Sequence, residues 1–146
     1  MQGIKLQYFP MRHEGKQFPT YKTLNLGDNL SLYRRIVDKF NFGKDILPFD
    51  LVDRVNKQAQ FHPGVNVKNN GFDLAKFLEE QQIIPQENVY LNWGAFDNID
   101  SMSSKDLSGN FKDIWFSGED LTLFDDSLNW MVLIDHHGSI GTLKID

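Results

Sequence analysis

The chain has no cysteine among its 146 residues. Disulfide bonds and cysteine-ligated zinc are therefore excluded. No apolar run approaches the roughly 20 residues that span a bilayer. The first residues also lack a basic stretch followed by an apolar one, which is the pattern of a secretory signal. We therefore expect a cytoplasmic protein that does not interact with a membrane.

Sequence patterns typical of enzymes are scarce as well. There is no glycine-rich phosphate loop, no HExxH zinc motif and no EF-hand pattern. Residues 138–141 approach the nucleophile motif G-x-S-x-G but lack its strand-to-helix context. With no cysteine nucleophile either, the sequence favours a protein that is not an enzyme and needs no cofactor.

Charge is divided unevenly along the chain. Residues 1–86 carry nine acidic and twelve basic residues, and residues 87–146 carry eleven acidic residues and three lysines, so the two net charges are +3 and −8 and sum to −5. The acidic half would repel nucleic acid and attract a basic surface. We therefore expect no nucleic-acid partner. A second interpretation is that these acids only solubilise one face of a sheet and its turns.

Hydropathy patterning predicts a single α+β domain over residues 1–146, with N-terminal helices packed on a C-terminal antiparallel sheet of about four to five strands. Helical periodicity is found over about residues 28–84. The expected helices run from Asp28 or Asn29 to Gly43, over about 48–58, and from the N-cap Asp73 to Pro85. Before them, residues 4–9 are expected as a strand and 11–27 as a loop, and 61–71 as a second loop.

Alternation of apolar and polar residues predicts the sheet over about residues 87–146. Its expected strands cover residues 88–93, 111–116, 120–124, 128–134 and 139–145. The connections are too short for helical crossovers, which favours antiparallel pairing. One strand has apolar residues on both faces, with Leu128, Trp130, Val132 and Ile134 on one face and Met131 and Leu133 on the other. We expect this strand at the centre of the sheet.

The strand ending at Ile134 leads into Asp135, His136 and His137. These three residues resemble the signature of the DHH phosphoesterases, which implies a divalent metal held by carboxylates and imidazoles. The family's upstream aspartate motifs have no counterpart in this chain. The competing interpretation is a hairpin turn, in which Gly138 supplies a positive φ and Asp135 hydrogen-bonds the local backbone. We favour the turn and expect no metal site.

The C-terminal segment carries a second resemblance, over about residues 111–145. It consists of Trp115-Phe116, then Glu119-Asp120-Leu121, the aromatic Phe124, Trp130 in an apolar strand, and His136-His137-Gly138. This pattern is similar to one in small bacterial immunity proteins of polymorphic toxin systems, including contact-dependent growth inhibition systems. The resemblance implies a protein that binds one cognate toxin inside the cell, in many cases a basic nuclease, and blocks it.

Five acidic residues of this segment are the candidate toxin-binding side chains: Asp113, Glu119, Asp120, Asp125 and Asp126. Together they would form an electrostatic face for a basic partner. Exposed aromatic residues nearby would supply the binding hot spots. Two other functions stay open at this point, a small metal-dependent hydrolase and an adaptor with a peptide groove and no toxin.

Overall fold

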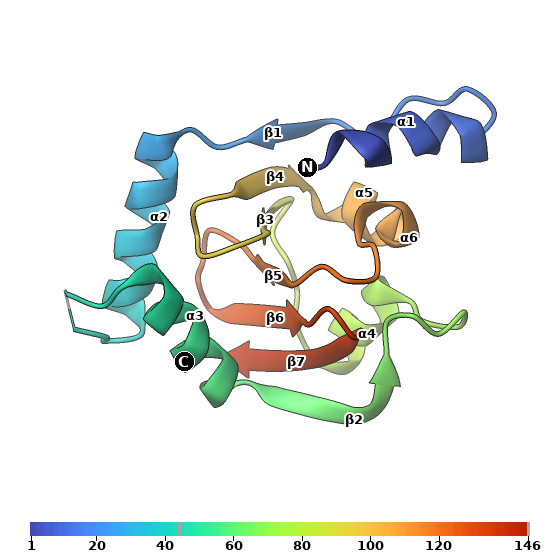
Figure 1. The fold of residues 1–146 in the computed structure, drawn as a ribbon. Helices are drawn as coiled ribbons and strands as arrows, with labels where there is room; N and C mark the ends of the chain where they lie inside the picture. The colour runs from blue at the N-terminus through green and yellow to red at the C-terminus, as the bar shows by residue number, and fades with distance from the viewer. Residues whose placement is uncertain (44, 146) are drawn as a thin grey trace.

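The computed structural model describes residues 1–43 and 45–145. At its centre lies a seven-stranded sheet in the order β1-β4-β3-β5-β6-β7-β2 (Figure 1). Every strand pair is antiparallel. The strands are β1 (Tyr21–Thr23), β2 (Gln60–Asn66), β3 (Asn88–Asn92), β4 (Ile99–Ser103), β5 (Leu121–Phe124), β6 (Trp130–Ile134) and β7 (Ser139–Lys144).

Helices cover both faces of this sheet (Figure 1). Apolar side chains of α2 and α3 pack on one face, and those of α4, α5 and α6 pack on the other. The described residues form α1 (Gly3–Arg12), α2 (Leu26–Lys39), α3 (Pro48–Gln58), α4 (Leu74–Glu80), α5 (Ser104–Gly109) and α6 (Phe111–Ile114). None of these helices is long and apolar enough to cross a membrane.

The mixed helix-and-sheet class and the antiparallel sheet are as predicted, but the sheet has more strands than the four to five expected. Strand β6 is buried along its whole length. Trp130 and Val132 belong to the core on one face, and Met131 and Leu133 belong to the core on the other. The prediction for Leu128 is wrong, because this residue has a positive φ of 54° before the strand and packs with Met131.

The predicted strand over residues 4–9 is instead part of α1. Its alternating pattern was misleading because the helix buries Lys5 together with Phe9, one turn apart, while Ile4 stays exposed. The predicted strand over 111–116 is also wrong. There, Phe111, Ile114 and Trp115 reach the same core at helical spacing, and the first two belong to α6.

An edge strand occupies part of each predicted loop: β1 lies within residues 11–27, and β2, which begins at Gln60, overlaps residues 61–71. Such strands are hard to detect in a sequence because they bury little. Strand β2 also contains Pro63 and Gly64, and its register shifts between Phe61 and Asn66. Strand β4 and α5 were not predicted. The division into a helical part (28–84) and a sheet part (87–146) does not hold in detail, because β2 lies in the first part and α5 and α6 lie in the second.

Helix boundaries follow their capping residues. Helix α2 begins three or four residues earlier than expected, because its N-cap is Asn25 rather than Asp28 or Asn29. The Asn25 side chain accepts a hydrogen bond from the Asp28 backbone N–H at 2.8 Å. It ends at Lys39 rather than at Gly43. The N-cap Asp73 of α4 is confirmed, with its carboxylate 3.1 Å from the Lys76 backbone nitrogen. Helix α3 covers residues 48–58 as predicted.

Candidate functional site

Two of the five candidate acids are buried and serve the fold. Asp113 on α6 pairs with Arg12 Nη1 at 3.0 Å and with His13 Nε2 at 2.8 Å. Asp125 is only 1% exposed. Its carboxylate accepts hydrogen bonds from the backbone N–H groups of residues 86 and 127 and from the indole N–H of Trp130. Neither carboxylate is available as part of an open binding surface.

The other three candidate acids reach the surface to different extents. Asp126 is exposed and forms an ion pair with Arg35 of α2 at 2.6 Å. Glu119 is mostly covered and pairs with Lys5. The side chain of Asp120 is 72% exposed. The five acids therefore do not form one face. Only Glu119 and Asp120 among them line a common surface hollow.

Residues 135–139 form the predicted hairpin turn between β6 and β7. The Oδ1 atom of Asp135 accepts hydrogen bonds from the backbone N–H groups of His137 and Ser139, both at 2.9 Å. Gly138 has the expected positive φ, at 89°. Among the described residues, no three His, Asp or Glu side chains are grouped so that they could hold a metal ion. The local geometry of Asp135 is that of a turn-forming residue.

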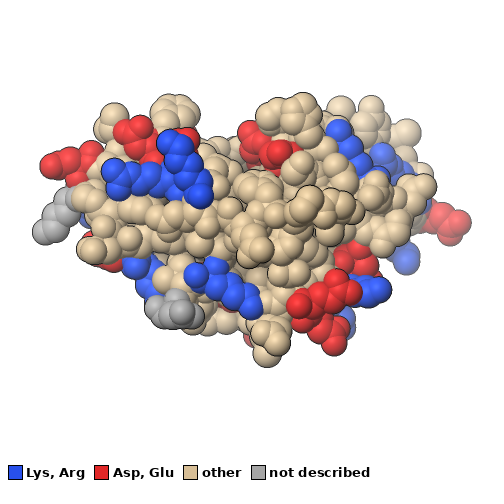
Figure 2. Space-filling view, turned by 90° about the horizontal axis from the view of Figure 1, so that it is seen from below, with Lys and Arg blue, Asp and Glu red and all other residues tan. Residues whose placement is uncertain are grey.

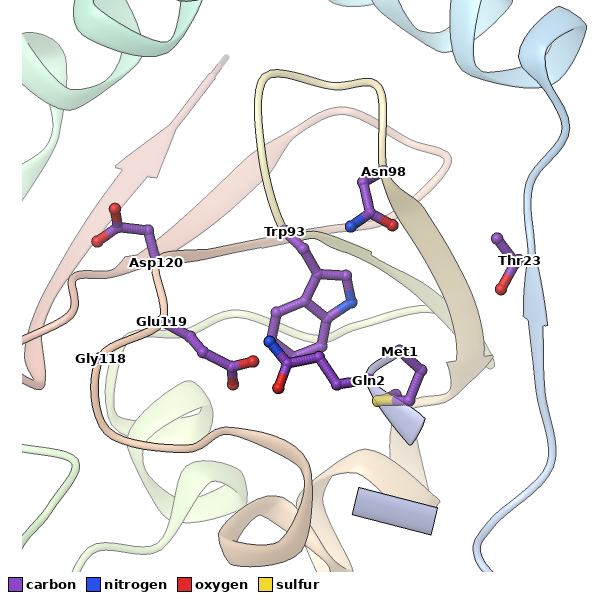
Figure 3. A pocket seen from close by; sticks show the side chains of 8 residues that line it. All are labelled: Met1, Gln2, Thr23, Trp93, Asn98, Gly118, Glu119 and Asp120. Atoms are coloured by element: carbon purple, nitrogen blue, oxygen red, sulfur yellow. The ribbon is translucent and has the colours of Figure 1, made fainter. Parts of the chain in front are cut away.

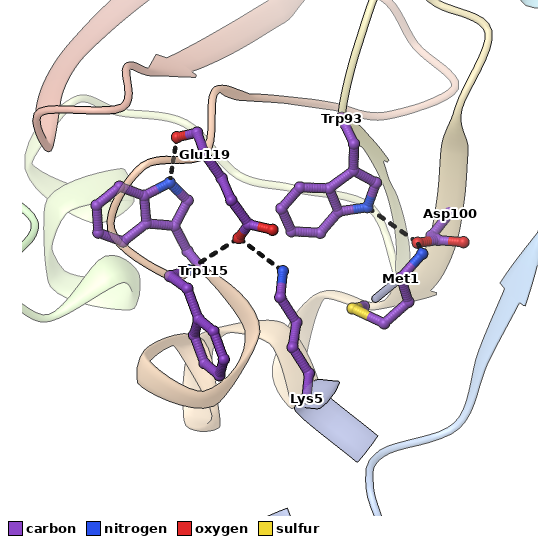
Figure 4. Close-up of polar contacts among 7 residues, drawn as sticks. Met1, Lys5, Trp93, Asp100, Trp115 and Glu119 are labelled. Atoms are coloured by element: carbon purple, nitrogen blue, oxygen red, sulfur yellow. Dashed lines mark hydrogen bonds and ion pairs between the residues drawn. The ribbon is translucent and has the colours of Figure 1, made fainter. Parts of the chain in front are cut away.

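A buried lysine, Lys5, anchors α1 beside the end of the sheet where β3 finishes and β5 starts (Figure 4). Lys5 Nζ lies 2.7 Å from Glu119 Oε2 and 3.9 Å from the centre of the Trp93 ring. The same Glu119 oxygen accepts a hydrogen bond from the Phe116 backbone N–H at 2.9 Å. Burial lowers the pKa of Lys5, and the contact with Glu119 partly opposes that shift. These contacts hold the Glu119 side chain in place and cover one face of the Trp93 ring.

Two hollows open at the end of the sheet where β3 and β6 finish and β4 and β5 start. We call this region the sheet-end surface. The first hollow has a volume of about 600 Å³ (Figure 3). The second, which we call the α3 groove, has a volume of about 380 Å³. Trp93 and Asp120 line both hollows, so the two hollows are neighbours on either side of these side chains.

The sheet-end surface is acidic. Of the described residues, no Lys or Arg lines either hollow. Glu119 is paired with Lys5, and the terminal ammonium of Met1, which also lines the first hollow, is paired with Asp100. The acidic character therefore comes from Asp120 and Asp135. Asp97 adds a further exposed carboxylate on the loop between β3 and β4. The face of the molecule seen in Figure 2 differs, because Lys and Arg lie there beside Asp and Glu and neither sign covers it.

A scan against protein-family models finds no match, and searches of curated proteins and of solved structures find none either.

Three residues of this surface were not singled out from the sequence. Trp93 was expected only as the end of a strand, yet it separates the two hollows. Phe49 is 81% exposed on the first turn of α3. Asp97 lies in a loop that has no hydropathy pattern. The one local signal was the Asn92-Trp93-Gly94 sequence, since polar residues and glycine mark the open end of a strand.

Proposed function

We propose that this protein is an immunity protein, which acts in the cytoplasm and neutralises a cognate toxin by direct binding without catalysing a reaction. The toxin is proposed to be a nuclease, whose nucleic-acid site presents a basic surface. One observation carries the proposal: the two hollows of the sheet-end surface are lined by carboxylates and by no Lys or Arg of the described residues. Opposite potentials of this kind accelerate association and exclude wrong partners.

Three aspartates of the sheet-end surface are held in place before any partner binds. The Oδ1 atoms of Asp97, Asp120 and Asp135 accept backbone N–H hydrogen bonds from Ala95 at 3.1 Å, His136 at 2.8 Å and Ser139 at 2.9 Å. Among the described residues, none donates a hydrogen bond to the Oδ2 atoms of these side chains. Each carboxylate therefore offers a fixed acceptor to a partner, which lowers the entropic cost of binding.

The test begins with the reading frame directly before the gene, because an immunity gene is expected to follow its toxin gene. Its product is expressed with and without this protein, and nuclease activity, cell survival and complex formation are measured. We expect a one-to-one complex that abolishes the toxin's activity. A toxic product that neither binds this protein nor loses activity in its presence would contradict the proposal.

A further inference from the structure

The α3 groove is lined by residues of two chemical kinds. Phe49 and Val52 of α3 are apolar, and Phe49 is 81% exposed. Asp120 and Asp135, next to the ends of β5 and β6, supply carboxylates to the same groove. A large aromatic side chain in water is a common feature of binding surfaces, because covering it on association is favourable. A partner that fills this groove therefore gains from both apolar and ionic contacts.

The two carboxylates are close together because of strand register. Leu121 of β5 pairs with Ile134 of β6, so Asp120 and Asp135 extend from matching ends of neighbouring strands. The backbone N–H of His136, the next residue after Asp135, donates to Asp120. The two carboxylates thus lie near each other in the groove that Phe49 and Val52 also line.

We infer that the α3 groove binds a segment of the partner in which an arginine or lysine stands next to a bulky apolar residue. The cation is placed at the free oxygens of Asp120 and Asp135, and the apolar side chain packs against Phe49 and Val52. This inference rests on the proposed function, and it names the part of the toxin that is recognised. The segment can also reach the first hollow, because Trp93 and Asp120 line both hollows.

The chemistry of the groove is tested without the toxin, by NMR titration of isotope-labelled protein with two capped tetrapeptides. One has the sequence Leu-Arg-Leu-Arg and the control has the sequence Leu-Glu-Leu-Glu. The basic peptide should shift the signals of the Thr122 and His136 amides and of the Trp93 indole, with amides of α4 unchanged. No shift at these groups, or equal shifts with the acidic peptide, would overturn the inference.

The role of the groove in toxin binding is tested with matched variants. Phe49→Ala is compared with Ile84→Ala, because Ile84 is 90% exposed and lies away from the groove. Asp120→Asn is compared with Glu80→Gln on α4. We expect each groove variant to weaken toxin binding by about tenfold or more, and each control by less than about twofold.

The outcomes separate the inference from the proposed function. If the wild-type protein neutralises the toxin and all four variants bind as tightly, the inference about the groove is wrong and the function stands. If the wild-type protein does not bind the toxin, the proposed function is wrong. The peptide titration then decides by itself whether the groove takes a basic, apolar segment.

Discussion

At the residue scale, neighbouring acids in this chain have opposite roles. Asp125 and Asp126 are adjacent and identical in type, yet one is buried at the start of a turn and the other is exposed beside Arg35. Burial of a carboxylate is tolerated when several donors satisfy its oxygens, and Asp125 has backbone, hydroxyl and indole donors.

Substitution of these two residues should have very different effects on stability. Asp125→Ala leaves buried donors without an acceptor, including the indole of Trp130, and should lower the free energy of unfolding by about 3 kcal/mol or more. Asp126→Ala removes an exposed ion pair and should lower it by less than about 1 kcal/mol. Urea unfolding followed by fluorescence measures both. Equal effects would contradict the structural role assigned to Asp125.

Lys5 is expected to make the free energy of unfolding depend on pH in a defined direction. Because burial lowers its pKa below 10.5 in the fold, the unfolded chain keeps this proton up to a higher pH than the folded chain does. The unfolded state therefore binds more protons between the lowered value and 10.5, and stability from this residue rises with pH across that window.

The comparison with Lys5→Met isolates this effect, because all other titrating groups are shared. We expect the free energy of unfolding of the wild type minus that of the variant to be constant well below the window and to grow as the pH rises towards 10.5. Denaturant unfolding at several pH values measures it. A difference that falls with rising pH would show that the pKa of Lys5 is not lowered in the fold.

At the element scale, the turn between β6 and β7 sets the position of Asp135 and His136. Gly138 has a φ of 89°, and a Cβ atom there would overlap Asn66 Oδ1 and approach Lys68 Cγ at 3.1 Å. Gly118 also has a positive φ, of 100°, but open space around it. A substitution at Gly118 therefore measures the cost of backbone strain alone, whereas the same substitution at Gly138 adds the cost of steric overlap.

Gly138→Ala should destabilise the protein by about 2–3 kcal/mol, and Gly118→Ala by about 1 kcal/mol. The first variant should also increase hydrogen exchange at the amides of residues 135–139, where the turn hydrogen bonds are formed. Thermal unfolding and exchange measurements test both statements. Equal destabilisation by the two substitutions would mean that β2 moves away from the turn at little cost.

Elements with regular apolar periodicity were predictable from the sequence. Helices α3 and α4 and strands β3, β5, β6 and β7 were all placed, although their ends differ by a few residues. Helix α1 was not predicted, because its buried face contains Lys5. A buried charge of this kind needs a partner, and the partner, Glu119, is 114 residues away in the sequence. Helix α6 has four residues, too few for a periodic pattern.

The candidate site was predictable only in part for a related reason. Acidic residues can be counted in a sequence, but their burial depends on contacts between distant segments. Asp120, selected as a candidate binding residue, is exposed, whereas Asp113 and Asp125, selected with it, are buried. Phe49 and Trp93 could not be recognised as surface residues, since aromatic side chains usually belong to the core.

At the scale of the whole molecule, the uneven charge along the chain is partly used within the fold. Basic residues of the first half pair with acidic residues of the second half, and these ion pairs join Lys5 to Glu119, Arg12 to Asp113 and Arg35 to Asp126. The total charge is therefore a poor guide to the surface. The acids that remain open at the sheet end are the ones expected to guide a basic partner.

Two triple variants with the same net charge test whether position matters. Asp97→Asn, Asp120→Asn and Asp135→Asn remove three charges from the sheet-end surface, and an Asn oxygen can still accept each backbone hydrogen bond. The control set is Glu14→Gln, Glu79→Gln and Glu80→Gln, all exposed and outside both hollows. Both sets change the net charge from −5 to about −2.

The most direct measurement is the association rate constant with the toxin at low and high salt, for the wild type and both triple variants. For the wild type, the rate constant should fall steeply with salt, because screening weakens steering. The sheet-end variant should associate about tenfold more slowly than the control variant at low salt, and the two should converge at high salt. Equal rate constants for the two variants at low salt would contradict recognition through the sheet-end surface.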